Sequence, residues 1–269
     1  MQKKAGRKDL VSVIIPSYKQ AKTIVEDVAR IERTLKQLED KYEIIIVVDG
    51  NVDKTIEKAM KIASKNIKVV GYKNNRGKGY AIRYGMVRSK GTILGFIDAG
   101  MDLNPNGILP LITYLKREHM DIVIGSKRHK ASRVNYPFNR KLLSILSQLF
   151  IRFLFGLNVK DTQVGMKFFQ REVLEAVLPR LLVKQFAIDI EILVVAYYLG
   201  YRKIGESPVE ITHNFTDSIV SENLFRSITR TFLDTLAIFY RLKILHYYDN
   251  TSRRKWKFDP ELSFRVNIG

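Results

Sequence analysis

Two apolar runs, YEIIIVVD (Tyr42–Asp49) and TILGFID (Thr92–Asp98), decide the fold class of this chain, because each is typical of a buried strand that ends in an aspartate. Segments of helical periodicity alternate with short apolar runs around them. We expect strands at 11–16, 42–48, 67–72, 92–97 and 121–125, and helices at 24–38, 54–64, 79–89 and 108–118. This alternation predicts an α/β fold with a mostly parallel sheet covered by helices on both faces. Ligands in such sheets bind beyond the carboxyl ends of strands, so residues just after strands are candidates for a site.

The charge of the chain predicts a polyanionic partner. The 269 residues include 46 Lys and Arg against 27 Asp and Glu, a net charge of +19, and no Cys, which excludes disulfides and thiolate metal sites. Nucleic acid, an anionic membrane surface and phosphorylated substrates all fit this excess. Because no helix-turn-helix, RRM or zinc-finger pattern is present, we expect no nucleic acid partner, and a nucleic-acid binder stays a rival supported by charge alone. The amino-terminal residues do not form a signal peptide, which predicts a cytoplasmic protein.

Two strongly apolar segments lie in the second half of the chain. The first, Lys141–Leu157, is shorter than the roughly 20 residues of a spanning helix, and the second, Phe232–Tyr248, carries three charged residues. Both predict amphipathic helices that lie in a membrane interface. The alternative for the first segment is a core helix or a dimer interface.

Carboxylates follow two of the expected strands. Asp49 ends one strand, Asp98 ends another, and Asp102 comes four residues later in DAGMD. A single aspartate in such a place is often only a helix cap or a turn former. Two strand ends of this kind favour a site, and we expect Asp98 and Asp102 to bind Mg²⁺ or Mn²⁺ together with substrate phosphates.

A glycine-rich basic segment, NNRGKGYAIRYG, lies between these acidic positions. Gly77 and Gly79 would let the backbone approach a phosphate, and Arg76 and Lys78 would supply positive charge. It matches neither the dinucleotide fingerprint nor the Walker loop, so on its own the segment favours a solvated basic helix over a phosphate site.

Taken in order, VSVIIPSYKQAKTI, IIIVVDGNVDKT, NRGKGYAIRYGM, GFIDAGMDLNP, IGSKR and DTQVGMKFF make the chain resemble the family 2 glycosyltransferases over about residues 10–215. The branch that it most resembles is that of the dolichyl-phosphate mannose and glucose synthases. The resemblance implies a GT-A fold, a nucleotide-diphosphate sugar as donor, a divalent metal, and a polyprenyl phosphate as acceptor.

The resemblance also implies roles for individual residues. Those expected to bind the nucleotide-sugar are Pro16, Tyr18, Asp49, Lys78 and Asp98. Those expected to face the reacting sugar are Asp161 and Gln163, in DTQVG, while Asp189 and Glu191, in AIDIE, match an acidic pair whose role varies in the family.

Basic residues shortly before the first apolar helix are candidates for holding the acceptor. A polyprenyl phosphate is already anionic and can attack without a strong general base, so the site must neutralise the acceptor and the departing diphosphate. We expect Arg128 to act in catalysis and Lys127, Arg133 and Arg140 to hold the acceptor phosphate. Alternatively, the side chains of these basic residues simply face solvent.

Three positions depart from the pattern of the family. Gln20 lies where a glutamate usually follows the first tyrosine motif, and Gly50 follows Asp49 where a second acidic residue is frequent. The third position is in DAGMD. Gly100 stands where a second aspartate usually follows Asp98, and an extended backbone would place Asp102 roughly 13 Å from Asp98. Two alternatives to lipid-phosphate transfer therefore stay open: a non-catalytic nucleotide-sugar binder, and transfer to a saccharide hydroxyl.

The expected organisation has three parts. Residues 1–9 form a basic tail, and residues 10–215 form the GT-A domain, with an apolar interfacial helix at about 140–157. Residues 216–269 form a helical appendage at the membrane surface. For a chain organised in this way, the resemblance implies a hexosyltransferase, and we expect it at the cytoplasmic face of a membrane.

Overall fold

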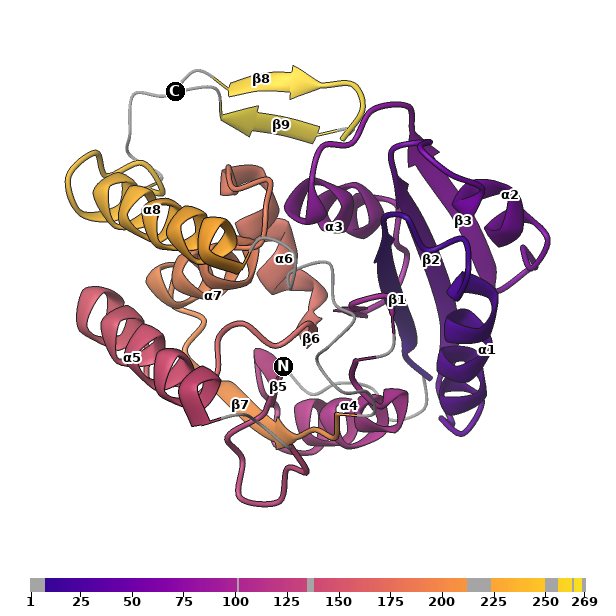
Figure 1. Ribbon diagram of the computed structural model, residues 1–269, viewed down its shortest axis with the longest axis horizontal. Helices are drawn as coiled ribbons and strands as arrows, with labels where there is room; N and C mark the ends of the chain where they lie inside the picture. Colours follow the sequence, from indigo (N-terminus) through magenta and orange to yellow (C-terminus); the bar gives the residue numbers. More distant parts are fainter. Residues whose placement is uncertain are drawn as a thin grey trace.

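A seven-stranded sheet forms the centre of the protein, in the order β3-β2-β1-β4-β6-β5-β7 (Figure 1). The computed structural model describes residues 8–100, 102–134, 138–211, 224–249, 256–262 and 264–267. The strands are β1 (Leu10–Ser17), β2 (Lys41–Asp49), β3 (Ile67–Tyr72), β4 (Ile93–Ile97), β5 (Ile122–Ser126), β6 (Met166–Gln170) and β7 (Ile204–Pro208). The helices are α1 (Ile24–Leu35), α2 (Thr55–Met60), α3 (Lys78–Val87), α4 (Ile108–Arg117), α5 (Phe138–Phe155), α6 (Arg171–Val177), α7 (Ile188–Tyr198) and α8 (Leu224–Lys243), with short 3₁₀ turns at Pro105–Gly107 and Leu178–Arg180.

The predicted α/β class with a mostly parallel sheet is confirmed. Strands β1, β2, β3 and β4 pair in parallel, and β5 pairs in parallel with β7. Strand β6 runs antiparallel to both β4 and β5. The sequence pattern did not predict β6 or β7, because MKFFQ and IGESP are short and have no clear period of their own.

Helices cover both faces of the sheet, as expected. Alternate residues of β1 point to opposite faces, so Ile14 packs with α3, α6 and α7, whereas Val13 and Ile15 pack with α1 and α4. Both sets of side chains are fully buried. The sheet therefore separates two apolar cores, as in other sheets that bury both faces.

The two apolar segments lie largely in α5 and α8, which contact each other on one side of the molecule (Figure 1). The second prediction extended too far, because α8 ends at Lys243 and Tyr248 is buried in the core. Phe150 stacks on Phe232 with ring centroids 5.2 Å apart. Each helix buries only part of its apolar surface: Ile151 and Phe155 of α5, and Ile238 of α8, join the core. Both helices also expose large apolar side chains, namely Leu142, Leu143, Ile145, Leu146, Leu149, Phe153, Ile228, Phe232, Leu233, Leu236 and Tyr240. Within the described ranges, neither helix is long and apolar enough to cross a membrane.

The end of the chain corrects the expectation of an entirely helical appendage. Strands β8 (Trp256–Asp259) and β9 (Phe264–Asn267) form an antiparallel hairpin. Apolar and polar residues alternate in WKFD and in FRVN, which is the period of a strand, and a proline follows the first of them. The predicted basic tail lies almost wholly outside the described residues, as does the boundary expected near residue 216.

Glu191 ties α7 to the end of the chain that follows α8. Its fully buried carboxylate accepts hydrogen bonds from the backbone N–H of Leu182 (3.0 Å) and Val183 (2.8 Å) and from the hydroxyl of Tyr248 (2.7 Å). Burial raises the pKa of Glu191, although these donors and nearby Arg241 act in the opposite direction. This carboxylate therefore joins α7 to the segment just before it and to Tyr248, which lies 57 residues further along the chain.

We expect Glu191→Ala to lower the free energy of unfolding by about 3 kcal/mol, because it leaves buried donors without an acceptor. Urea denaturation measures this change. The matched control is Glu175→Ala on α6, whose exposed ion pair with Arg171 (3.6 Å) should contribute less than about 0.5 kcal/mol. Equal effects of the two substitutions would contradict the role given to Glu191.

Candidate active site

The antiparallel direction of β6 brings three separate motifs to one edge of the sheet. The carboxyl ends of β4 and β5 carry Asp98 and Lys127, and the amino end of β6 between them follows directly from DTQVG. The backbone N–H of Asp98 donates to the carbonyl oxygen of Gly165 (2.9 Å), which joins two of these motifs. The sheet thus assembles the site from residues about 70 positions apart in the sequence.

A cavity of about 700 Å³ opens at this edge. One part of its wall is charged or polar and consists of Lys78, Asp98, Asp102, Lys127, Gln163 and Asp189. The other part comes mostly from α5 and α8 and is largely apolar, with Leu143, Leu146, Phe150, Ile151, Ile228 and Phe232. The cavity therefore has a charged end and an apolar end.

Asp98 and Asp102, at the two ends of DAGMD, both line the cavity. Gly100 has φ +94°, a conformation that side chains other than glycine rarely adopt. Its N–H donates to the carboxylate of Asp27 on α1 (3.1 Å), which fixes the turn. The backbone is therefore turned, and not extended, at Gly100.

A row of four alternating charges runs from the cavity into the core: Asp98, Lys78 and Asp189 line the cavity, and Lys167 lies behind them. The ammonium of Lys78 lies 2.8 Å from the nearer Asp98 oxygen and 2.8 Å from Asp189 Oδ2. On the far side of Asp189, the fully buried Lys167 donates to Asp189 Oδ1 (2.5 Å) and to the carbonyl of Val164. Each charge in the row has an opposite charge beside it, which offsets the cost of its burial.

The row fixes the protonation of its members. Burial acts to lower the pKa of Lys78, but Asp189 and Asp98 outweigh it, and the net shift is upward. Burial acts to raise the pKa of Asp189, but Lys167 and Lys78 hold it below its usual value. Desolvation raises the pKa of Asp98 in spite of Lys78, and burial lowers the pKa of Lys167. Lys78 is therefore a cation and Asp189 an anion throughout the neutral pH range.

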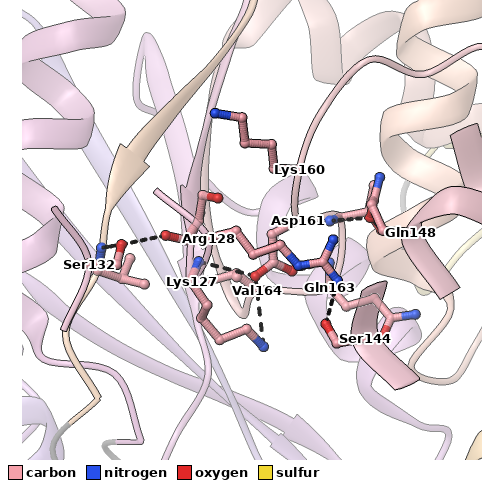
Figure 2. Close-up of polar contacts among 12 residues, drawn as sticks. Lys127, Arg128, Ser132, Ser144, Gln148, Lys160, Asp161, Gln163 and Val164 are labelled. Carbon is pink, nitrogen blue, oxygen red and sulfur yellow. Dashed lines mark hydrogen bonds and ion pairs between the residues drawn. The ribbon is translucent and has the colours of Figure 1, made fainter. Parts of the chain in front are cut away.

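Asp161 organises the basic residues that flank the cavity, and Figure 2 shows Lys127, Arg128 and Gln163 gathered around it. Its carboxylate accepts from the backbone N–H of Lys127 (3.1 Å) and of Gln163 (3.3 Å). Arg128 donates to the hydroxyl of Ser144 on α5 (2.7 Å), a residue of the cavity wall. Asp161 itself is buried behind these residues, so it positions them rather than lining the cavity.

Residues 12–178 match the family model of glycosyl transferase family 2. The chain belongs to this family. It is 30% identical to the dolichyl-phosphate beta-glucosyltransferase of Dictyostelium discoideum over 222 residues, which are 77% of the chain and 66% of that relative. It is 33% identical to the dolichol-phosphate mannosyltransferase of Pyrococcus furiosus over 236 residues, 86% of the chain and 63% of that relative. The chain therefore spans about two thirds of the length of these relatives.

A solved structure confirms the GT-A fold of this glycosyltransferase. The structure is that of glucosyl-3-phosphoglycerate synthase from Mycobacterium tuberculosis in complex with Mn²⁺, UDP-glucose and phosphoglyceric acid. The TM-score is 0.63 at 21% identity, with coverage of 98% of this chain and 87% of the other.

Other residues predicted from the sequence of this glycosyltransferase lie beside the cavity or away from it. Pro16, Tyr18 and Asp49 lie at the carboxyl ends of β1 and β2 and do not line the cavity. The carboxylate of Asp49 accepts from the N–H groups of Arg76 (2.7 Å) and Gly77 (2.9 Å), so it holds the glycine-rich loop.

Two further residues of the predicted set, Arg133 and Glu191, do not line the cavity. Arg133 is exposed and pairs through its backbone with Glu210 beside β7. The side chain of Arg140 lies outside the described part of α5. Glu191 is a residue of the core, two positions from Asp189 on the same helix.

The sequence pattern missed Lys167, which this glycosyltransferase places at the buried end of the charge row. A lysine flanked by apolar residues in MKFF was the available signal, since a cation in a buried strand needs an anionic partner. That partner could not be identified before the sheet and α7 were placed together.

We expect Gly165→Ala to reduce turnover of the nucleotide-sugar by about 100-fold, the scale of losing one preorganised charge contact. A Cβ atom at Gly165 would lie 1.9 Å from Asp98 Oδ2, so the carboxylate must move away from Lys78. The matched control is Gly107→Ala, where the nearest atom is the sulfur of Met166 at 3.3 Å. Full turnover by Gly165→Ala would show that the position of Asp98 does not matter for catalysis.

Proposed function

We propose that this chain transfers a hexose from a nucleotide-diphosphate sugar, of the GDP-mannose or UDP-glucose type, to a polyprenyl phosphate at the cytoplasmic face of a membrane. The observation that carries the proposal is the single cavity with a charged floor and apolar walls. A polyprenyl phosphate has the same division between an anionic head and an apolar chain. A saccharide acceptor could use the hydroxyl groups on these walls, such as those of Ser147 and Thr231, but it would gain little from their leucine, isoleucine and phenylalanine side chains.

The relatives support this choice of substrates. The two similar curated proteins are named for transfer to dolichyl phosphate, one as a glucosyltransferase and one as a mannosyltransferase. The similar solved structure holds UDP-glucose together with Mn²⁺. These names leave the choice between glucose and mannose, and between UDP and GDP, to experiment.

The residues of the cavity fit a divalent cation that is shared with a substrate. Asp98 and Asp102 supply hard carboxylate oxygens to the same space, and the residues that the structure describes contain no cluster of three or more possible ligands. Two carboxylates suit Mg²⁺ or Mn²⁺ when phosphate oxygens complete the coordination. A bound cation would share Asp98 with Lys78, and it would supply neutralisation of the departing diphosphate.

The basic residues of this chain can neutralise the two anions that meet during transfer. Lys78 and Lys127 line the charged part of the cavity, and Arg128 is fixed at its rim by Ser144. The apolar walls lower the local dielectric constant, which strengthens each of these interactions. We assign the diphosphate to Lys78, beside Asp98, and the acceptor phosphate to Lys127 and Arg128.

Neither Asp161 nor Asp189 is placed to remove a proton from an acceptor. Asp161 uses its oxygens to accept from the backbone of Lys127 and Gln163. Asp189 is held by two ammonium groups that lower its pKa. The two other carboxylates of the cavity, Asp98 and Asp102, are those assigned to the cation. This arrangement suits an acceptor that is already ionised, because a hydroxyl acceptor needs a general base.

We therefore expect transfer to polyprenyl phosphate with Mn²⁺ to be nearly independent of pH from about 6.5 to 8.5. The second ionisation of a phosphate monoester is near pH 6, while Lys78 has a raised pKa and Asp189 a lowered one, so none of the three titrates in this window. The measurement is the initial rate of glycolipid formation from UDP-glucose and from GDP-mannose.

Two outcomes would contradict the proposal. A rate that rises with pH in this window and is abolished by Asp161→Asn would indicate transfer to a hydroxyl. Binding of the nucleotide-sugar without any turnover would indicate a non-catalytic binder.

The surface formed by α5 and α8 supports the membrane part of the proposal. Its exposed apolar side chains, including Phe153 at 86% exposure, lie among the exposed cations Arg152, Arg230 and Lys243. Each basic residue near an anionic surface contributes about 1 kcal/mol to binding. Because the wall of the cavity belongs to the same two helices, an acceptor could enter with its chain still in the lipid.

We expect the protein to sediment with vesicles that contain phosphatidylglycerol and to be released by salt, since screening weakens the attraction. Phe153→Ser should weaken the partition by about tenfold, the effect of losing roughly 1.4 kcal/mol of apolar burial. The control is Met60→Ser, also exposed (57%) but on α2, across the sheet from α5. Equal recovery in the supernatant with and without anionic vesicles would refute the membrane role.

A further inference from the structure

The glycine-rich loop Asn74–Gly79 carries Lys78 into the cavity and is held on two sides. Asp49 holds it from the sheet, as described above. The other side is the segment before α7: Gly79 N–H donates to the carbonyl of Lys184 (2.8 Å). A Cβ atom at Gly77 would lie 2.3 Å from this same oxygen, so the packing is close enough to require glycine.

The β8–β9 hairpin contacts the loop and the start of α3 on a third side (Figure 1). The carboxylate of Glu261 accepts from both terminal nitrogens of the Arg76 guanidinium, one of them at 2.9 Å, and from the hydroxyl of Tyr80 at 2.5 Å. Arg76 also donates to Tyr80 (2.8 Å), and Arg88 donates to the carbonyl of Glu261 (2.7 Å). Three residues of one segment therefore converge on one residue of the hairpin.

The hairpin turn is itself well fixed. Asp259 Oδ1 accepts from the N–H groups of Glu261 (2.9 Å) and Leu262 (3.0 Å), and the side chain of Leu262 is buried. A single ion pair with side chains 38% and 45% exposed would contribute little. A bidentate guanidinium contact reinforced by Tyr80 and Arg88 restricts the loop more than an isolated pair would.

We propose that Glu261 is a positioning residue for the donor site, acting through Arg76 and Tyr80 on the loop that carries Lys78. Arg76, Tyr80 and Glu261 do not line the cavity, whereas Lys78 does. The hairpin therefore does not touch the substrate and acts by keeping Lys78 beside Asp98 before the donor arrives. The inference rests on the proposed function insofar as it concerns donor binding.

The first test needs no substrate. Hydrogen exchange measured on the full chain should show faster exchange of the amides of Arg76, Gly77 and Gly79 in Glu261→Gln, by about fivefold, which corresponds to about 1 kcal/mol. Amides of β1 and α4 should exchange as in the wild type. The matched control is Glu175→Gln on α6, whose carboxylate is exposed and lies outside the site. Unchanged exchange in the loop would overturn the proposal.

The second test separates positioning from a general structural role. In Glu261→Gln, KM for the nucleotide-sugar should rise about fivefold, while kcat and KM for polyprenyl phosphate stay within about twofold of the wild type. A fall in kcat with an unchanged donor KM would overturn the positioning role. A wild-type protein that binds neither UDP nor GDP in calorimetry would refute the proposed function, and the exchange experiment would still decide whether the hairpin braces the loop.

Discussion

The placement of the Lys78 ammonium between Asp98 and Asp189 is the constraint on which the rest of the site depends. The three residues come from α3, β4 and α7, and the buried Lys167 of β6 holds Asp189 from behind. Charges in an apolar interior are stable only when opposite charges lie beside them. The sheet and the two helices must therefore meet in one arrangement for the row to form, and each motif of the site follows from that arrangement.

The charge row also explains why two neighbouring acidic residues of α7 have different roles. Asp189 and Glu191 are two positions apart on α7, and residues at this spacing on a helix point in different directions. Asp189 faces the cavity and its two lysines, while Glu191 faces the core and accepts from Leu182, Val183 and Tyr248. One side of the helix thus belongs to the site, and the other joins the end of the chain to the catalytic fold.

The helices α5 and α8 contribute to the core, to the cavity wall and to the outer surface of the protein. Ile151 and Ile238 anchor the two helices in the core, and their remaining apolar side chains either line the cavity or are exposed. One pair of helices therefore provides both the apolar wall of the site and an adjacent apolar surface. This continuity is a physical reason why a lipid acceptor suits the protein better than a soluble one.

The sequence by itself determined the α/β class and the positions of Asp98 and Asp102, because period, burial and strand ends are local properties. It also identified the motifs of the family and the two amphipathic helices. Only the tertiary structure decided that Asp27 accepts from Gly100 at the turn of the acidic loop, that Lys167 belongs to the charge row, and that Glu261 reaches Arg76. Each of these depends on which distant segments meet, above all on the antiparallel insertion of β6 between β4 and β5. No local pattern encodes such a meeting, since the partners lie from about 20 to 185 residues apart.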